Sequence, residues 1–182
     1  MQCGRPFPVS EEGGLSLCSS CREEENMFDL SLSSFCFNET LKKALYSFKY
    51  QKKAHYGYFL SAFLKARLRR AFPESRWEEY HMVPVPLHPV KQRSRGFNQS
   101  EVLAKHLSRR LHVREPEMIL KRKTFTRSQT GLDRKERKEN VEDAFILKRE
   151  KDIHGEKVLL VDNVLTTGAT LNECARVLKQ HG

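Results

Sequence analysis

The residues best suited to chemistry lie in Val158–Leu171, where an apolar run meets an acid, three threonines and a glycine. The run Val158–Val161 predicts a fully buried parallel strand that ends at Asp162. In open α/β sheets, ligands bind outside the carboxyl ends of the strands, and a helix N-terminus attracts phosphate. We therefore predict a phosphate site, with Asp162 placed for the hydroxyl groups of a sugar. Its residues are Asp162, Asn163, Thr166, Thr167, Gly168, Ala169 and Thr170.

A simpler interpretation of this segment is that the threonines and Gly168 only cap a helix, and that Asp162 is an ordinary strand-end residue. A cap alone needs neither three threonines nor an acid upstream of them, so the ordered combination favours the phosphate site. The segment also differs from a Walker P-loop, which requires a lysine after its second glycine.

Three cysteines near the N-terminus form a second and weaker motif. Cys18 and Cys21 make a C-x-x-C pair, and Cys3 followed by Gly4 resembles the second half of another pair. Three ligands do not complete a tetrahedral zinc site, so either the chain begins late, or Cys36 or a non-cysteine residue supplies the fourth. The alternative is that these are loop cysteines without metal.

Basic residues dominate the middle of the chain. Residues 81–151 hold 18 Lys and Arg against 9 Asp and Glu, whereas residues 1–80 hold 12 against 10, and the whole chain carries +10. Basic and aromatic side chains interleave here, as in proteins that hold single-stranded nucleic acid. A pyrophosphate site with solvated lysines explains several of them equally well. The residues concerned are Arg93, Arg95, Phe97, Lys121, Arg122, Lys123, Phe125 and Arg127.

The elements that must position these residues follow from apolar periodicity and capping signals. A helix is expected after Asn38 and another over about residues 56–70. The inward residues expected in the second helix are Phe59, Leu60, Phe63, Leu64 and Leu68. Residues 82–87 suit a strand only at an edge or at its end, because they contain two prolines. A third helix is expected after Asn98, with a stripe of apolar residues buried. That stripe is Val102, Leu103, Leu107 and Leu111.

In the last third of the chain, segments with weak secondary-structure patterns alternate with segments whose patterns are strong. Residues 121–143 are charged and poor in apolar residues, which predicts a mobile loop followed by a charged helical stretch. A short strand is expected over Ala144–Leu147. Thr170 and Glu173 have the spacing of a capping box and predict the start of the last helix.

The fold class expected from these elements is α/β, in two parts. Residues 1–35 form a small cysteine-containing module, and residues 36–182 form the main domain, whose sheet either is short or lacks a C-terminal strand. No apolar stretch approaches the roughly 18 residues of a membrane span, and no secretory signal begins the chain. These features favour a cytoplasmic protein.

Further motifs give the chain a family resemblance. They are Phe48–Tyr50 (FKY), Val83–His88 (VPVPLH), Arg95–Gln99 (RGFNQ) and a T-x-x-Q pattern that starts at Thr126 and runs to Asn140. Together with the phosphate loop, they resemble the ComF-type proteins of bacterial competence, a branch of the type I phosphoribosyltransferases. The resemblance covers almost the whole chain.

The resemblance implies a Rossmann-like parallel sheet that binds phosphoribosyl pyrophosphate with magnesium. Thr166–Thr170 would hold the 5-phosphate, and Asp162 would be the catalytic residue that binds the ribose. The pyrophosphate would lie near Leu87 and His88, and residues 122–137 would close over the ligand. The N-terminal module would be a zinc ribbon, with Cys3, Cys18 and Cys21 as ligands.

The same resemblance implies a role in DNA uptake, with single-stranded DNA and a helicase-like ATPase as partners. The family usually has two consecutive acids, whereas this chain has Asp162 and Asn163. Loss of one carboxylate bears on catalysis, because paired acids bind the ribose and steer the metal-bound ligand. The alternatives are an active phosphoribosyltransferase in nucleotide metabolism and a nucleotide-sensing regulator on the same fold.

Overall fold

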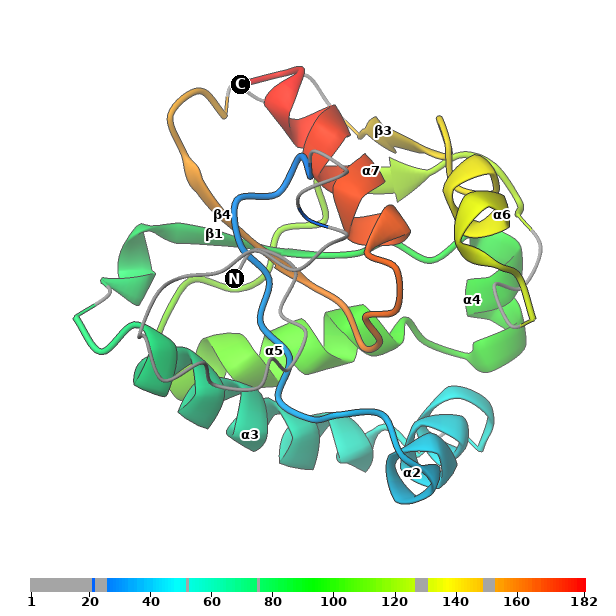
Figure 1. Ribbon diagram of the computed structural model, residues 1–182. Helices are drawn as coiled ribbons and strands as arrows, with labels where there is room; N and C mark the ends of the chain where they lie inside the picture. The colour runs from blue at the N-terminus through cyan, green and yellow to red at the C-terminus, as the bar shows by residue number, and fades with distance from the viewer. Residues whose placement is uncertain (1–20, 22–25, 52, 75, 127–130, 149–152) are drawn as a thin grey trace.

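A computed structural model describes residues 21, 26–51, 53–74, 76–126, 131–148 and 153–182 (Figure 1). Its centre is a pair of parallel strands, β1 (Tyr80–Pro84) and β4 (Lys157–Val161). Helices α3 (His55–Ala71) and α5 (Gln99–Leu111) cover one face of the pair, and α7 (Ala169–Lys179) covers the other. The expected α/β class is therefore confirmed.

Alternate side chains of β1 enter the two cores on either side of the pair. Met82 packs with Leu103, Leu107 and Trp77 on the side of α3 and α5. Val83 packs with the buried residues of α7 on the other side. This alternation is the ordinary consequence of the two-residue period of a strand, and it makes the pair a wall between two apolar layers.

The two parallel strands end together. Pro84 lies opposite Val161, and the Val85 N–H donates to the Val161 carbonyl at 2.9 Å. The strand predicted over residues 82–87 begins earlier and ends at Pro84, because a proline donates no ladder hydrogen bond. Two segments follow these strands, Val85–His88 and Asp162–Thr167. Both consequently leave the sheet at the carboxyl ends of the strands.

Strand β4 is less buried than its apolar sequence predicts. Val161 is buried, but Val158, Leu159 and Leu160 are only half-buried. Among the described residues, β4 pairs with β1 alone, so its second edge has no hydrogen-bonded neighbour there. The prediction of a fully buried strand is therefore wrong for three of its four residues.

Helix α3 turns three of its five predicted inward residues to the core: Leu68 is buried, and Leu60 and Leu64 pack against the same cluster. The two predicted phenylalanines are the exceptions. Phe59 and Phe63 are 56% and 53% exposed, whereas Gly57, Ser61 and Leu68 are buried. The cause is close contact with α5: a Cβ atom on Gly57 would lie 2.7 Å from Val102 Cγ1. Small residues are needed where two helices approach this closely, so the large aromatic side chains point outward.

Two predicted helix caps are present and hold the helices that flank the site. Helix α2 (Glu39–Tyr50) begins after Asn38, whose Oδ1 accepts the Leu41 N–H at 2.8 Å. Asn98 caps α5 in the same way, and its Nδ2 donates to the Val85 carbonyl at 3.0 Å. Because Val85 follows β1 directly, this bond fixes the start of α5 at the end of the strand.

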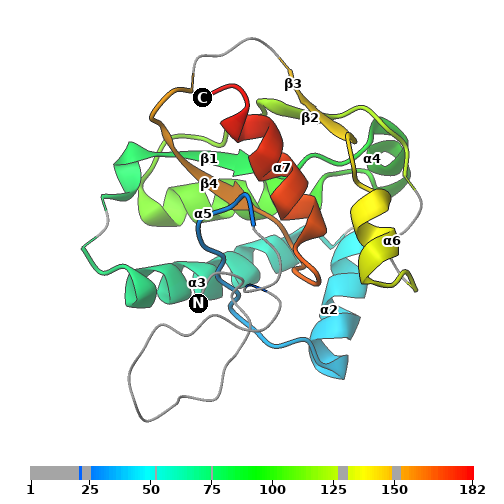
Figure 2. The ribbon, with the colours of Figure 1, turned by 45° about the horizontal axis from the view of Figure 1, so that its top comes forward.

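Short elements complete the domain. They are η1 (Trp77–Glu79), α4 (Pro89–Arg95), β2 (Leu120–Arg122), α6 (Arg134–Glu139) and β3 (Phe145–Leu147). Strands β2 and β3 are antiparallel and lie beside α7, on the side away from α3 (Figure 2). The charged helical stretch and the short strand expected near these positions are confirmed. None of the described helices is long and apolar enough to cross a membrane.

The described part of the expected N-terminal module packs on the main domain. The Met27 N–H donates to Asn172 Oδ1 at 2.6 Å, Lys179 pairs with Asp29 at 2.7 Å, and Phe28 is buried. Residues 26–29 therefore belong to the surroundings of α7. The boundary predicted between residues 35 and 36 stays a prediction.

Candidate ligand site at the carboxyl ends of the parallel strands

The acid at the end of β4 is held in place from two sides. Asp162 is half-buried, and its Oδ1 accepts hydrogen bonds from Ser100 Oγ and from the Asn163 N–H, both at 2.8 Å. Ser100 lies in the first turn of α5, which Asn98 anchors to the end of β1. The two strand ends and the start of α5 thus fix one carboxylate at the edge of the sheet.

The electrostatic environment of Asp162 is mixed. Burial raises its pKa, while the hydrogen bonds from Ser100 and Asn163 and the charges of Lys49 and Arg122 oppose that rise. The carboxylate therefore lies among groups that favour its ionised form, in a place that water reaches poorly. Such a group interacts strongly with a charged or hydroxyl-bearing ligand, because the local dielectric constant is low.

Helix α7 (Ala169–Lys179) begins immediately after the loop that follows Asp162. Its N-cap is Gly168, with φ of 84°, a left-handed conformation that glycine adopts without strain. The predicted cap at Thr170 is wrong, because the left-handed turn at Gly168 starts the helix at Ala169. Thr167 Oγ1 instead accepts the Ala169 N–H at 3.4 Å. The N–H groups of the first helical turn face the loop, which is the arrangement that attracts phosphate.

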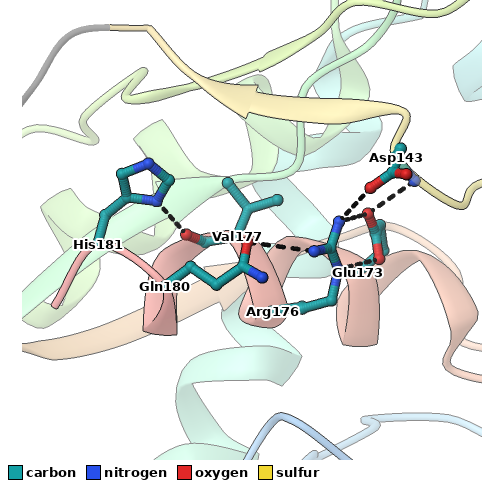
Figure 3. A network of polar contacts seen from close by, with 6 residues as sticks. All are labelled: Asp143, Glu173, Arg176, Val177, Gln180 and His181. Carbon is teal, nitrogen blue, oxygen red and sulfur yellow. Dashed lines mark hydrogen bonds and ion pairs between the residues drawn. The ribbon is translucent and has the colours of Figure 1, made fainter.

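Glu173, the expected partner in that cap, belongs to a different network (Figure 3). It accepts the Asp143 N–H at 2.9 Å and two hydrogen bonds from Arg176, which also pairs with the Asp143 carboxylate at 2.7 Å. The hydrogen bonds from Arg176 to Glu173 raise the pKa of Arg176. This network joins α7 to Asp143, two residues before β3. It therefore anchors the helix that begins after the loop of Asp162 to the segment that leads into β3.

Four basic side chains from three elements interact electrostatically with Asp162 or with one another. Burial lowers the pKa of Lys49 of α2, of Lys91 of α4 and of Arg122 of β2. Arg95 of α4 lowers each of these pKa values further, while Asp162 raises those of Lys49 and Arg122. Asp162 interacts with two of these cations, Lys49 and Arg122, and the four cations outnumber this one carboxylate, so the site favours an anion.

Arg122 is the most buried of these cations. Its Nη2 donates to Thr126 Oγ1, and its guanidinium lies 5.1 Å from the Phe145 ring centre. Its buried Nε has no hydrogen-bond partner among the described residues. A buried N–H without a partner is costly, and an anionic ligand oxygen would satisfy it. For this residue, burial favours the pyrophosphate interpretation over contact with a strand of DNA at the surface.

Leu87 and His88, predicted near the pyrophosphate, are half-buried in the segment that follows β1. His88 caps α4, and its Nδ1 accepts the Val90 N–H at 3.3 Å. Its ring lies 5.2 Å from that of Phe125, and Lys91 Nζ lies 5.6 Å from the same ring. The structure thus joins the segment after β1 to the loop after β2.

The other residues predicted to bind DNA are spread over the surface beside this pocket. Arg93, Lys121, Lys123 and Phe125 are exposed, while Arg95 and Phe97 are half-buried. The Arg95 guanidinium lies 5.3 Å from the Tyr50 ring centre, and Phe97 packs on Phe48 at 5.7 Å. Arg127 lies outside the described residues. DNA contact by these residues stays a prediction.

Sequence reasoning missed three residues of the site: Lys49, Lys91 and Ser100. Lys49 is the centre of the Phe-Lys-Tyr motif, which carried the family resemblance without being assigned to the site. Ser100 directly follows the Arg-Gly-Phe-Asn-Gln motif, so both could have been found by treating motif residues as site residues. No local pattern marks Lys91, because its position comes from α4 folding against the loop after β2.

The zinc site stays a prediction. Cys21 is buried, while Cys3 and Cys18 lie outside the described residues. Cys36, one of the suggested fourth ligands, is exposed. Within the described ranges, no three His, Cys, Asp or Glu side chains lie close enough to hold a metal ion.

Comparison with known proteins agrees with this geometry. Residues 98–182, which run from the cap of α5 through α7, match the phosphoribosyl transferase domain family. No solved structure matches the chain significantly.

Several curated proteins are similar along nearly the whole chain. Competence protein F of Haemophilus influenzae is 33% identical, over 91% of this chain and 73% of its own length. DNA utilization protein YhgH of Escherichia coli K12 is 29% identical, over 100% and 78%. Competence protein ComFC of Bacillus subtilis is 25% identical, over 99% and 71%. The chain therefore belongs to the ComF-type family of phosphoribosyltransferase-like proteins.

Proposed function

We propose that this chain binds phosphoribosyl pyrophosphate at the carboxyl ends of β1 and β4 and works in the handling of DNA during uptake. One observation carries the first part: the loop from Asp162 to Gly168 joins a strand end to a helix N-terminus, and its carboxylate interacts with the cations Lys49 and Arg122. A sugar that carries a phosphate at one end and a diphosphate at the other matches this distribution of charge.

Each part of the ligand has a partner in the site. The 5-phosphate lies at the N-terminus of α7, where Thr167 and the first-turn N–H groups donate to it. Asp162 accepts from the ribose hydroxyls, and Ser100 keeps it oriented. The diphosphate extends toward Leu87 and His88, where Arg122 and Lys91 offset its charge.

Magnesium fits this site only as a companion of the ligand. Asp162 is the one carboxylate in the loop, and one of its oxygens already accepts two hydrogen bonds. Magnesium needs about six oxygen ligands and binds readily through substrate phosphates and water. The ligand would therefore supply most of them, and the ion would neutralise the diphosphate charge.

The neutral Asn163 beside Asp162 favours binding over base transfer. A transferase stabilises positive charge on the ribose as the diphosphate leaves, and a second carboxylate contributes to that stabilisation. If the chain is nevertheless an active transferase, catalysis depends on Asp162, and an acceptor base is consumed as pyrophosphate is released. Assaying pyrophosphate release with and without acceptor bases separates the two functions.

The DNA part of the proposal has separate support. Relatives of this chain are named for competence and for DNA utilization, and the chain carries +10. A net positive charge suits a polyanion such as single-stranded DNA. A nucleotide-sensing regulator would instead bind one nucleic-acid sequence and respond to the ligand.

A thermal-shift experiment tests the ligand site. Phosphoribosyl pyrophosphate with magnesium should raise the melting temperature, since a ligand that binds only the folded state stabilises it. Asp162→Ala and Thr167→Val should lose most of this shift, and Thr40→Val, in the first turn of α2, serves as the matched control. An equal shift in all four proteins would place the ligand elsewhere.

A further inference from the structure

Six aromatic side chains on or beside helices α2 and α3 are more than half exposed. A globular protein rarely gathers so many large apolar side chains at its surface without a binding partner, whereas isolated ones are common. The six are Phe37, Tyr46, Tyr50, Tyr58, Phe59 and Phe63.

These rings are ordered along the helices. Tyr46 and Tyr50 are four residues apart on α2, with ring centres 4.9 Å apart. Phe59 and Phe63 have the same spacing on α3, and an edge of Phe63 meets the ring of Phe35 at 4.8 Å. Residues four apart share a helix face, so each helix shows an outward aromatic pair.

The same two helices carry a concentration of positive charge. Residues 39–71 contain nine Lys and Arg and a single acid, Glu39, which gives +8. The net charge of residues 1–80 is only +2, because acidic residues before and after the helices offset the +8 of residues 39–71. Among the described residues, Lys42 with Glu39 is the one ion pair on these helices, so most of the cations have no acidic partner there.

On α3, cations and rings occupy one face rather than separate faces. Arg67 and Arg70 are both exposed, and at four and seven residues after Phe63 they continue the outward stripe of α3. A helix that lies on a membrane keeps its basic residues apart from its apolar face, and protein interfaces are depleted of lysine at their core. Interleaved rings and cations suit a chain of phosphates and planar bases.

We propose that the outward stripe of α3, formed by Phe59, Phe63, Arg67 and Arg70 and called here the aromatic–basic face, binds single-stranded nucleic acid. Bases stack on the two rings, and the arginines neutralise phosphates. The proposal rests on the DNA-handling function proposed above and places the strand on a surface other than the one predicted around Arg93, Lys121 and Phe125.

The test measures fluorescence anisotropy of a labelled dT oligonucleotide of about 20 nucleotides, at several salt concentrations. In Phe59→Leu with Phe63→Leu, apolar area is retained but stacking is lost, and affinity should fall by about 10-fold or more with an unchanged salt slope. In Arg67→Glu with Arg70→Glu, the slope of log affinity against log salt should fall by about 1.4, at roughly 0.7 per phosphate.

Two controls accompany these variants. Arg114→Glu with Lys148→Glu makes the same charge change on exposed residues outside α2 and α3, and should leave more of the affinity intact than the α3 reversal. Lys121→Glu with Lys123→Glu tests the other surface. The proposal requires a larger loss from the α3 variants than from either control.

The outcomes separate this proposal from the function on which it rests. If the wild type binds and the α3 variants bind equally well, the face is not the DNA surface, although DNA handling stands. If the wild type fails to bind at low salt, both DNA proposals fail, and the thermal shift with phosphoribosyl pyrophosphate still judges the ligand site. If Phe59→Leu with Phe63→Leu retains binding while Phe59→Ala with Phe63→Ala loses it, apolar area rather than stacking holds the strand, and the stacking proposal is overturned. The proposal is also overturned if these phenylalanines instead join two copies of the chain.

Discussion

Helices α3 and α5 pack against each other and use their apolar residues in opposite ways. Helix α5 buries Leu103, Leu107 and Leu111, which are the leucines expected from its periodicity. Helix α3 gives Leu68 to the same core, but it buries Gly57 and Ser61 where it meets α5 and exposes two phenylalanines. Helix α5 therefore buries all its leucines, whereas α3 leaves two of its large apolar residues at the surface.

The difference shows that apolar spacing locates a helix but does not by itself choose the buried face. At the contact, Gly57 lies so near Val102 that no added methyl group fits without movement. Close backbone approach excludes large side chains, and a helix that keeps its aromatics outward is free to use them for binding. Helix α5 combines its packing role with a hydrogen bond from Ser100 that orients Asp162.

The largest expected effect is loss of packing on α5. Leu107 is 1% exposed within the core between α5 and β1, so Leu107→Ala should lower the free energy of unfolding by about 2–5 kcal/mol. Urea unfolding followed by circular dichroism measures it. A loss under about 1 kcal/mol would mean that α5 is less central than the structure shows.

Loss of the hydrogen bond from Ser100 should change ligand binding more than folding. Ser100→Ala removes the donor that orients the Asp162 carboxylate, so affinity for phosphoribosyl pyrophosphate, measured by titration calorimetry, should fall by up to about 10-fold, equivalent to about 1.4 kcal/mol.

The pH dependence gives a second readout of the same variant. The hydrogen bond from Ser100 lowers the pKa of Asp162, so its removal raises that pKa further. Protonated Asp162 cannot accept from two ribose hydroxyls, and the acid limb of binding should therefore move to higher pH. A variant whose affinity and acid limb match those of the wild type would show that Asp162 does not bind the ligand.

A smaller effect is expected where the helices touch. Gly57→Ala gains about 1 kcal/mol of helix propensity but overpacks Val102 by about 1–3 kcal/mol, for a net loss of about 1 kcal/mol. Val102→Ala should relieve the overpacking, so the double variant should be more stable than the two single losses predict. Additive losses in the unfolding measurements would show that the two residues do not touch.

The smallest effect is expected on the outward face of α3. Phe59→Ala removes a side chain that is 56% exposed, so the free energy of unfolding should change by less than about 0.5 kcal/mol. The same unfolding assay applies. A loss as large as that of Leu107→Ala would mean that Phe59 is buried in solution and that the predicted inward face was right.

Signals that act within a few residues predicted their elements well. Asn38 and Asn98 cap their helices as expected, and the buried leucines of α5 follow from spacing alone. The order of apolar residues, acid, threonines and glycine at Val158–Leu171 likewise predicted a parallel strand, a loop and a helix, which the structure confirms. These features depend on backbone geometry that neighbouring residues determine.

What the sequence did not predict depends on contacts between distant segments. The half-buried state of Leu159 reflects the number of strand neighbours, which no single strand encodes. Lys49 and Arg122 meet around Asp162 although long stretches of chain separate them. Phe59 and Phe63 fit a helical stripe, but their size excludes them from a contact made by Gly57. Site residues and buried faces of this kind require the fold itself.

Titration calorimetry with phosphoribosyl pyrophosphate and magnesium tests the central claim most directly, comparing the wild type with Asp162→Ala, Thr167→Val and Phe59→Ala. We expect measurable binding by the wild type, affinities about 10- to 100-fold weaker in the two loop variants, and wild-type affinity in Phe59→Ala. Unchanged binding in both loop variants, or no binding by the wild type, would contradict a ligand site at the carboxyl ends of β1 and β4.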